Sequence, residues 1–348
     1  MAEFNAAVQE RLLDLKREND LELARRSVEL KAQSDLQLAQ FNMVSTEQLS
    51  AEAARRTYEY EARKRLYHDC EPLLFQLSQN ARVAIGRVIS LARNARDGQL
   101  EGPDGALSGD LREASGRGYY FRSTLYQLLA PLGVSYILQT NLTFQDMSLD
   151  PWTERQFLLS EAAYEAFTRD FLFAGLTPAI DGYRETADRP NAQEGVARHR
   201  KQGVFLGRLD IAVNCLVERN AEAAQVITFG AFEKRILDPD SELAKAMEPL
   251  ASIFATFHPG KCPVTWRILV AQYFILRAIR LSQREKLGRG EQDDTLTRIV
   301  LNEATVNELA WKQPADEEVT APLHIGLKYL ASALHQRPLT AVPITRCG

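Results

Sequence analysis

The feature that most constrains the fold is the near absence of helix breakers from the first 97 residues. They contain one glycine, Gly86, and one proline, Pro72, whereas the remaining 251 of the 348 residues hold 18 glycines and 13 prolines. Because glycine and proline are the main interrupters of helices, this stretch predicts long helices. We therefore expect an all-α protein, with a helical arm over residues 1–97, whose last helix packs on the body, and a helical globular domain over 98–348.

The arm is expected to consist of three helices in sequence. The first is predicted from about Ala2 to Met43. Ser45 with Gln48 three residues later has the pattern of a capping box, which predicts the start of a second helix. Pro72 suits the first turn of a third helix, since the missing proline N–H has no intrahelical partner there.

One face of the first predicted helix is apolar near its beginning. Phe4, Val8, Leu12 and Leu15 are spaced by four, four and three residues, so they share a helix face. Beyond Leu15 this apolar line weakens and charges are dense. Because so polar a helix is marginal in water by itself, the four residues predict an oligomer interface within an imperfect coiled coil. The alternative is a single solvated helix that is partly frayed.

Composition and charge limit the classes of function. The formal net charge of −4 gives no overall attraction for nucleic acid or acidic membranes. The four cysteines are scattered without a CxxC pair, which predicts free thiols and a cytoplasmic location. The first 20 residues lack the pattern of a signal peptide. No apolar stretch of about 18 residues occurs, so we expect no membrane span, with an interfacial role for Tyr119–Leu138 as the minor alternative.

The remaining residues predict short-looped helices with one strand. Asp150 and Pro151 form a good helix start, with the aspartate as cap and the proline in the first position. A short strand is expected over Gln225–Phe229. The expected helices span residues 119–140, 151–175, 203–218, 241–257, 264–284, 293–311 and 321–335.

Metal-binding and nucleophilic patterns are weak. His68 and Cys70 are two residues apart, and Glu161 and Glu165 share a helix face, but neither pair has the further ligands that zinc or di-iron sites need. We therefore expect no metal and no cofactor. His258 and Cys262 flank a Pro-Gly turn, where an imidazole could activate the thiol. The sequence supplies no orienting third group, and an ordinary turn explains this segment equally well.

Two basic clusters are candidates for anion binding. Arg198, His199, Arg200 and Lys201 precede a predicted helix start, where the helix dipole favours a phosphate or carboxylate, unless neighbouring acids neutralise them. The segment from Arg55 to Asp97 has nine basic and five acidic residues and could grip a nucleic-acid backbone. Aromatic residues that could form a stacking platform, or simply pack in the core, are Tyr58, Tyr60, Tyr67, Tyr119, Tyr120 and Phe121.

The functional hypothesis that these patterns favour is a non-catalytic assembly or adaptor protein. It would associate with itself through residues 1–45 and could also bind a protein partner. One alternative is a nucleic-acid- or nucleotide-responsive protein that uses the arginine-rich helices. Another is an enzyme whose site is assembled from residues distant in sequence, since no local catalytic motif is present.

Overall fold

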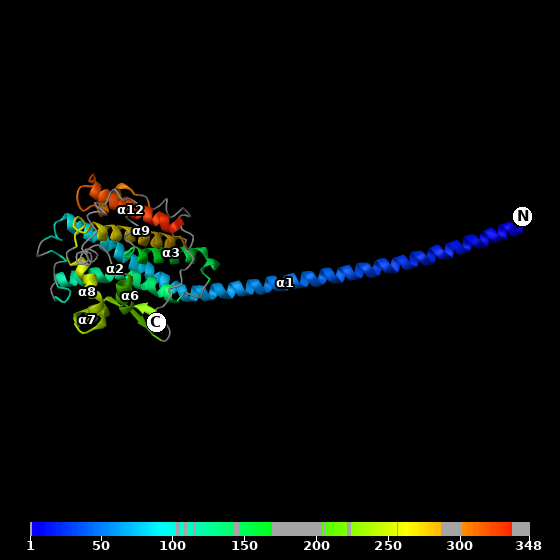
Figure 1. The fold of residues 1–348 in the computed structure, drawn as a ribbon, viewed down its shortest axis with the longest axis horizontal. Coiled ribbons are helices and arrows are strands. Elements are labelled where there is room, and N and C mark those ends of the chain that lie inside the picture. Colours follow the sequence, from blue (N-terminus) through cyan, green and yellow to red (C-terminus); the bar gives the residue numbers. More distant parts are fainter. Residues whose placement is uncertain are drawn as a thin grey trace, which may run out of the picture. The chain divides into compact units, whose positions relative to one another are not determined.

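The computed structural model describes residues 2–101, 105–107, 110–113, 116–141, 146–168, 204, 206–220, 224–255, 257–286, 299 and 301–335. The chain divides into two compact units, Met1–Arg65 and Leu66–Gly348, each of which is described by itself. Within these ranges the structure has nine α-helices and one two-stranded sheet, which confirms the all-α prediction (Figure 1).

A single helix, α1 (Ala2–Arg96), replaces the three helices expected over the arm. The predicted break at Ser45 is wrong, because the helix runs through this residue; the next residue, Thr46, donates its hydroxyl to the Asn42 carbonyl one turn back over 2.7 Å instead of capping a new helix. The predicted break at Pro72 is also wrong. The proline ring leaves the carbonyl of His68 without its helical donor, but both residues are exposed, so water can supply the missing bond.

The second unit begins inside α1 and contains all the other elements. Leu66, Leu77, Val88 and Leu91 of α1 are buried in its core. The elements that follow are α2 (Gly116–Asn141), the 3₁₀ turn η1 (Met147–Leu149), α3 (Pro151–Glu165), α6 (Leu206–Cys215), β1 (Val217–Arg219), β2 (Ala224–Val226), α7 (Phe229–Leu237), α8 (Glu242–Phe254), α9 (Pro263–Lys286), α11 (Glu303–Leu309) and α12 (Glu317–His335).

Helix starts in this unit follow the sequence signals. Asp150 caps α3, and its carboxylate accepts the Thr153 N–H over 3.0 Å, with Pro151 in the first position, as predicted. Ser241 caps α8 in the same way, accepting the Ala244 N–H over 3.0 Å. Each such cap satisfies a backbone donor that the helix itself leaves unpaired.

One predicted element has the wrong extent. The helix expected over 203–218 ends at Cys215, because β1 follows and pairs antiparallel with β2, Val217 opposite Val226. The expected strand over Gln225–Phe229 is accordingly shorter and earlier, at Ala224–Val226. The pairing explains both differences, since a strand needs a neighbour that no local pattern reveals. The predicted continuations of α3 to residue 175 and of a helix from residue 293 fall outside the described residues.

The core of the second unit is built around α9 and α2. Helix α9 packs against α12 and α3, while α2 contacts α3, α6, α7, α8 and β2. A Cβ atom on Gly326 of α12 would lie 3.0 Å from Phe274 and from Val270, so the glycine permits the close approach of α12 to α9. Between α9 and α2, the buried Gln272 donates to the Leu128 carbonyl over 3.1 Å.

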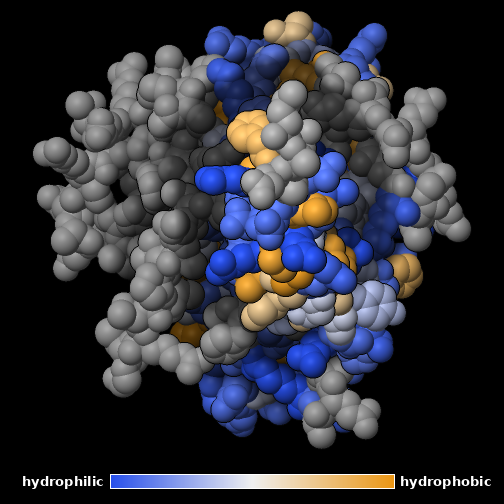
Figure 2. All heavy atoms as spheres, turned by 90° about the vertical axis from the view of Figure 1, so that its right-hand side faces the viewer, coloured by the Kyte–Doolittle hydropathy of each residue, from blue (hydrophilic) through white to orange (hydrophobic). Residues whose placement is uncertain are grey.

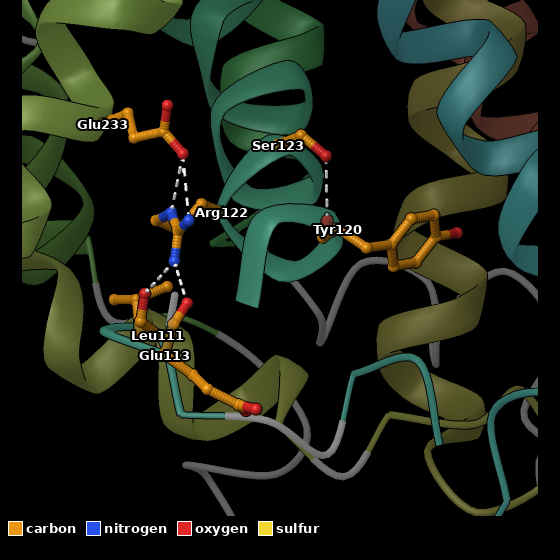
Figure 3. A network of polar contacts seen from close by, with 6 residues as sticks. All are labelled: Leu111, Glu113, Tyr120, Arg122, Ser123 and Glu233. Carbon is orange, nitrogen blue, oxygen red and sulfur yellow. Dashed lines mark hydrogen bonds and ion pairs between the residues drawn. The ribbon is translucent and has the colours of Figure 1, made fainter. Parts of the chain in front are cut away.

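A buried arginine ties α2 to α7 and to the loop before α2. Arg122 is 3% exposed, and its guanidinium donates to Glu233 Oε1 from Nε (3.1 Å) and Nη2 (2.9 Å). Its Nη1 donates to the carbonyls of Leu111 (3.0 Å) and Glu113 (2.6 Å). Figure 3 shows the guanidinium group between these partners. Since the charge is paired and the donors are used, Arg122 has a structural role.

Candidate functional site

The first unit exposes large apolar side chains over its whole length. The predicted interface residues Phe4, Val8, Leu12 and Leu15 lie on α1 and are 73%, 43%, 61% and 54% exposed. The same is true of the leucines, valines and aromatic residues that follow, as far as Tyr60. Figure 2 shows apolar residues in orange lying open at the surface beside hydrophilic residues in blue. Exposure of this kind is characteristic of interaction surfaces.

Ion pairs along the helix stabilise this segment locally. Arg26 bonds to Glu22 over 2.7 Å and Arg55 to Glu59 over 2.9 Å, both one helical turn apart. Pairs with this spacing contribute about 0.2–0.5 kcal/mol each. They favour the helix, but they are too weak to offset the exposure of so much apolar surface.

The apolar side chains of α1 are ordered in a way that the ordinary helix period does not reveal. One line along the helix, the long stripe, consists of Leu23, Ser27, Leu30, Ser34, Leu38, Phe41, Ser45 and Leu49, with spacings of four, three, four, four, three, four and four. This is an 11-residue repeat of about 3.67 residues per turn. No member is charged. Val8, Leu12 and Tyr60 fall on the same repeat, but they are separated from the stripe by Lys16 and Asn19 at one end and by Glu52 and Arg56 at the other.

A second line, the short stripe, consists of Val28, Ala32, Leu36, Ala39 and Met43, spaced by four, four, three and four residues. At about 98° per residue in an 11-residue repeat, it lies roughly 160° around the helix from the long stripe. A shallow groove on this side is lined by Ala39, Met43 and Ser50, together with Asn42, Thr46 and Glu47. Neither stripe follows the seven-residue repeat of an ordinary coiled coil, so that repeat does not reveal them.

The basic residues of α1 have different environments. In the first unit, Arg55 and Arg56 are held by Glu59 and Glu52. In the second unit, Arg87 donates to Gln127 over 2.8 Å and lies 4.4 Å from the ring centre of Tyr120. Arg96 donates to the backbone carbonyls of Asn307 and Ala310. These four of the nine basic residues of the predicted patch are thus engaged within the chain.

A group of three arginines, of which only Arg82 lies in the predicted basic segment, includes two exposed members, Arg82 and Arg284. Arg82 of α1 and Arg284 of α9 lie near Arg280 of α9 and lower its pKa, although burial of Arg280 lowers that pKa most. Where the structure describes the chain, none of the three forms an ion pair. Like charges gathered without a carboxylate provide a suitable environment for an anion. The other predicted cluster, Arg198, His199, Arg200 and Lys201, lies outside the described residues.

The His-Pro-Gly-Lys-Cys segment forms a turn in which the histidine has structural contacts. Nδ1 of His258 accepts the Gly260 N–H over 3.1 Å, while Nε2 lies 3.6 Å from Glu101. The buried ring packs edge-on against Trp311, with 5.3 Å between ring centres. Burial lowers the pKa of His258, which Glu101 partly opposes, so the neutral imidazole is favoured. These contacts account for His258 without reference to the Cys262 thiol.

The predicted metal-ligand pairs have ordinary surroundings. His68 is exposed and its Nδ1 lies 3.0 Å from Asp69. Burial raises the pKa of Cys70 to about 12, with Asp69 adding to the effect, so its thiol stays protonated. Glu161 and Glu165 both lie on α3. Across the parts of the chain that the structure describes, no three potential ligands among His, Cys, Asp and Glu gather at one point.

The aromatic residues are divided between surface and core. Tyr58 and Tyr60 are exposed on the first unit, whereas Phe121 is buried. The hydroxyl of Tyr120 accepts from Asn94 over 2.8 Å, and Tyr119 packs edge-on against Phe229. The second unit therefore uses these rings mainly for packing.

No helix among the described residues is long and apolar enough to cross a membrane. Comparison with known protein families, with curated proteins and with solved structures found no match to this chain.

Proposed function

We propose that this protein is a non-catalytic assembly or adaptor protein that associates with itself through the N-terminal arm. The observation that supports the proposal is the exposure of Phe4, Val8, Leu12 and Leu15, and of the apolar residues beyond them, on a helix of the first unit. Residues 2–65 of this helix extend over about 95 Å at ~1.5 Å per residue. An isolated polar helix is marginal in water, and a partner would remove the exposed apolar surface.

The four predicted interface residues supply only part of the free energy that such an interface needs. Burying one leucine- or phenylalanine-sized side chain stabilises a complex by about 1.5–3 kcal/mol. Four such residues therefore contribute on the order of 6–12 kcal/mol before the cost of association, which is about 4–15 kcal/mol. The predicted interface alone is close to balance, so association needs the apolar residues beyond Leu15 as well.

Light scattering after size-exclusion chromatography tests the proposal. The wild-type chain should have a mass above that of the 39.2 kDa monomer. Replacing Phe4, Val8, Leu12 and Leu15 by serine should lower the mass at the same concentration. The matched control replaces the exposed Gln9, Gln33, Gln37 and Gln40 by serine and should leave the mass unchanged. A wild-type chain that is monomeric at high concentration contradicts the proposal.

A second candidate function is binding of a nucleic acid or nucleotide through arginines of the second unit. The observation that favours it is the group of Arg82, Arg280 and Arg284, whose charges repel one another without a carboxylate partner among the described residues. Contacts to phosphates release counterions, so such binding weakens steeply as salt is added.

Fluorescence anisotropy with a labelled single-stranded oligonucleotide tests this candidate. Replacing the three arginines by glutamine should weaken binding at least tenfold and reduce its salt dependence. The control removes the same charge from the exposed Lys234, Lys245 and Lys328. Binding that is insensitive to salt, or that is weakened equally by both triple variants, speaks against a site at the three arginines.

A further inference from the structure

The two apolar stripes of α1 point in nearly opposite directions. The long stripe runs from Leu23 to Leu49 and the short stripe from Val28 to Met43, roughly 160° apart around the helix. Their members are equally open: Leu30 and Leu38 of the long stripe are 66% and 61% exposed, and Leu36 and Met43 of the short stripe 60% and 64%. A two-helix coiled coil covers only one face of each helix. One partner therefore cannot cover both stripes.

We infer that the arm binds a second copy of this chain, antiparallel, along the long stripe, and that the short stripe then joins such pairs into assemblies of more than two chains. The inference rests on the proposed self-association and adds its partner, orientation and order. Three observations support it: the reversal symmetry of the long stripe, the distribution of charge and the relative lengths of the two stripes.

The long stripe matches itself when it is reversed about residue 36. In an antiparallel pair centred there, Leu23 opposes Leu49, Ser27 opposes Ser45, and Ser34 opposes Leu38, while Leu30 and Phe41 are offset by one residue. Leu12 and Tyr60 oppose each other at the ends of the repeat. In a two-fold symmetric interface, when residue i of one chain contacts residue j of the other, residue j of the first chain also contacts residue i of the second. The long stripe must therefore fit its own reversed copy. The Ser27 hydroxyl already donates to the Ala24 carbonyl over 2.8 Å, so its burial leaves no donor unpaired.

The charges of the arm favour the antiparallel orientation. Glu18, Asp20 and Glu22 place three acids within five residues, and residues 55–65 contain five basic and two acidic residues. A parallel pair would set each of these blocks against its own copy. In the antiparallel pair residues 18–22 face 50–54, with one acid, and residues 55–65 face 7–17, with three basic and two acidic residues. Like-charge repulsion is therefore lower in the antiparallel pair.

Length decides which stripe acts first. The long stripe covers about 39 Å of helix from Leu23 to Leu49 without a charged member, and Lys16, Glu52 and Arg56 interrupt its extension toward Leu12 and Tyr60. The short stripe covers about 23 Å from Val28 to Met43, and Arg25 and Glu47 interrupt its extension toward Leu21 and Tyr58. It is too short to hold two chains by itself, but a pair presents it twice, which raises its effective strength.

Charged substitutions on each stripe separate the two steps. The full-length variants are Leu30→Glu with Leu38→Glu on the long stripe, and Leu36→Glu with Met43→Glu on the short stripe. The control is Gln33→Glu with Gln37→Glu, which adds the same kind of charge between the stripes. Near-ultraviolet circular dichroism of Trp152, Trp266 and Trp311, all in the second unit, verifies that the body stays folded.

Sedimentation velocity should find more than two chains for the wild type and the control, two chains for the short-stripe variant and one chain for the long-stripe variant. A wild type of two chains, a short-stripe variant with the wild-type mass, or a control that dissociates equally overturns the inference while leaving self-association standing. A monomeric wild type overturns the proposed function itself.

Cysteine cross-linking tests the orientation. In a background with Cys215→Ser and Cys347→Ser, Ser27→Cys chains mixed with Ser45→Cys chains should form covalent dimers on mild oxidation, and either variant alone should not. In the antiparallel pair the two Ser27 positions are about 27 Å apart, far beyond the reach of a disulfide. Efficient cross-linking of Ser27→Cys chains by themselves would show a parallel pair and overturn the orientation.

Discussion

At the scale of single residues, Arg122 makes four hydrogen bonds that join separate parts of the second unit. Its guanidinium holds Glu233 of α7 and the carbonyls of Leu111 and Glu113 (Figure 3). Replacing Arg122 by methionine keeps much of the volume but leaves a partly buried carboxylate and two carbonyls without their donor. We predict a loss of about 3 kcal/mol in the free energy of unfolding, measured by urea denaturation. A loss below about 1 kcal/mol would mean that water replaces these bonds.

His258 gives a prediction about pH. Burial lowers its pKa in the folded protein, and the unfolded chain has the ordinary value of about 6.5. The unfolded state therefore takes up the proton first as pH falls, so the stability that neutral His258 contributes is complete above pH ~6.5 and is lost as pH falls toward the lower folded pKa. We expect His258→Gln to be less destabilising at pH 5.5 than at pH 7.5 in urea denaturation. A difference that grows on acidification would mean that Glu101, not burial, dominates.

At the scale of elements, we predict opposite changes in stability when two helical glycines are replaced by alanine. A Cβ atom added to Gly86 of α1 would have no neighbouring atom within 4 Å, whereas a Cβ on Gly133 of α2 would lie 2.8 Å from Val226 of β2. Gly86→Ala should therefore stabilise the protein by about 1 kcal/mol, the usual helix preference. Gly133→Ala should destabilise it, because the strand must move. Thermal unfolding of both variants measures the two changes in Tm. Equal changes would show that Val226 of β2 does not resist a Cβ atom at Gly133 of α2.

The elements also show how far sequence reasoning reaches here. Asp150 and Pro151 identified the start of α3 because a cap is a local event that needs only neighbouring residues. Strand β1 was not foreseen because a strand is stabilised by pairing with a second strand. Its partner β2 lies beyond a connecting segment, so the local sequence of β1 does not reveal the pairing. Ser45 and Pro72 resembled helix boundaries, yet both occur inside α1, since the backbone groups there can be satisfied by the preceding turn or by water.

The candidate site was foreseen only in part. Phe4, Val8, Leu12 and Leu15 stand out in the sequence because their spacing follows the ordinary helix period. The long stripe and the short stripe follow an 11-residue period and occupy opposite faces, so a single apolar face was not visible there. The meeting of Arg82 with Arg280 and Arg284 could not be foreseen, because it brings together residues of α1 and α9 that are about 200 positions apart in the sequence.

At the scale of the whole molecule, the boundary in amino-acid composition and the boundary between the two compact units fall at different residues. The change in glycine and proline content at residue 97 marks where helix breakers begin, whereas the packing boundary lies between Arg65 and Leu66, inside one helix. Many apolar residues of α1 from Leu66 onward, such as Leu77, Val88 and Leu91, are buried in the second unit, and most of those before Leu66 are exposed. The same helix therefore serves as a core element in one unit and as the candidate interface in the other.

Sedimentation equilibrium of the full chain over a range of protein concentrations tests the central claim, self-association through the arm, most directly. Self-association predicts a mass that exceeds 39.2 kDa and rises with concentration, because association follows mass action. A mass of 39.2 kDa at every concentration, with the arm still helical by circular dichroism, would contradict it.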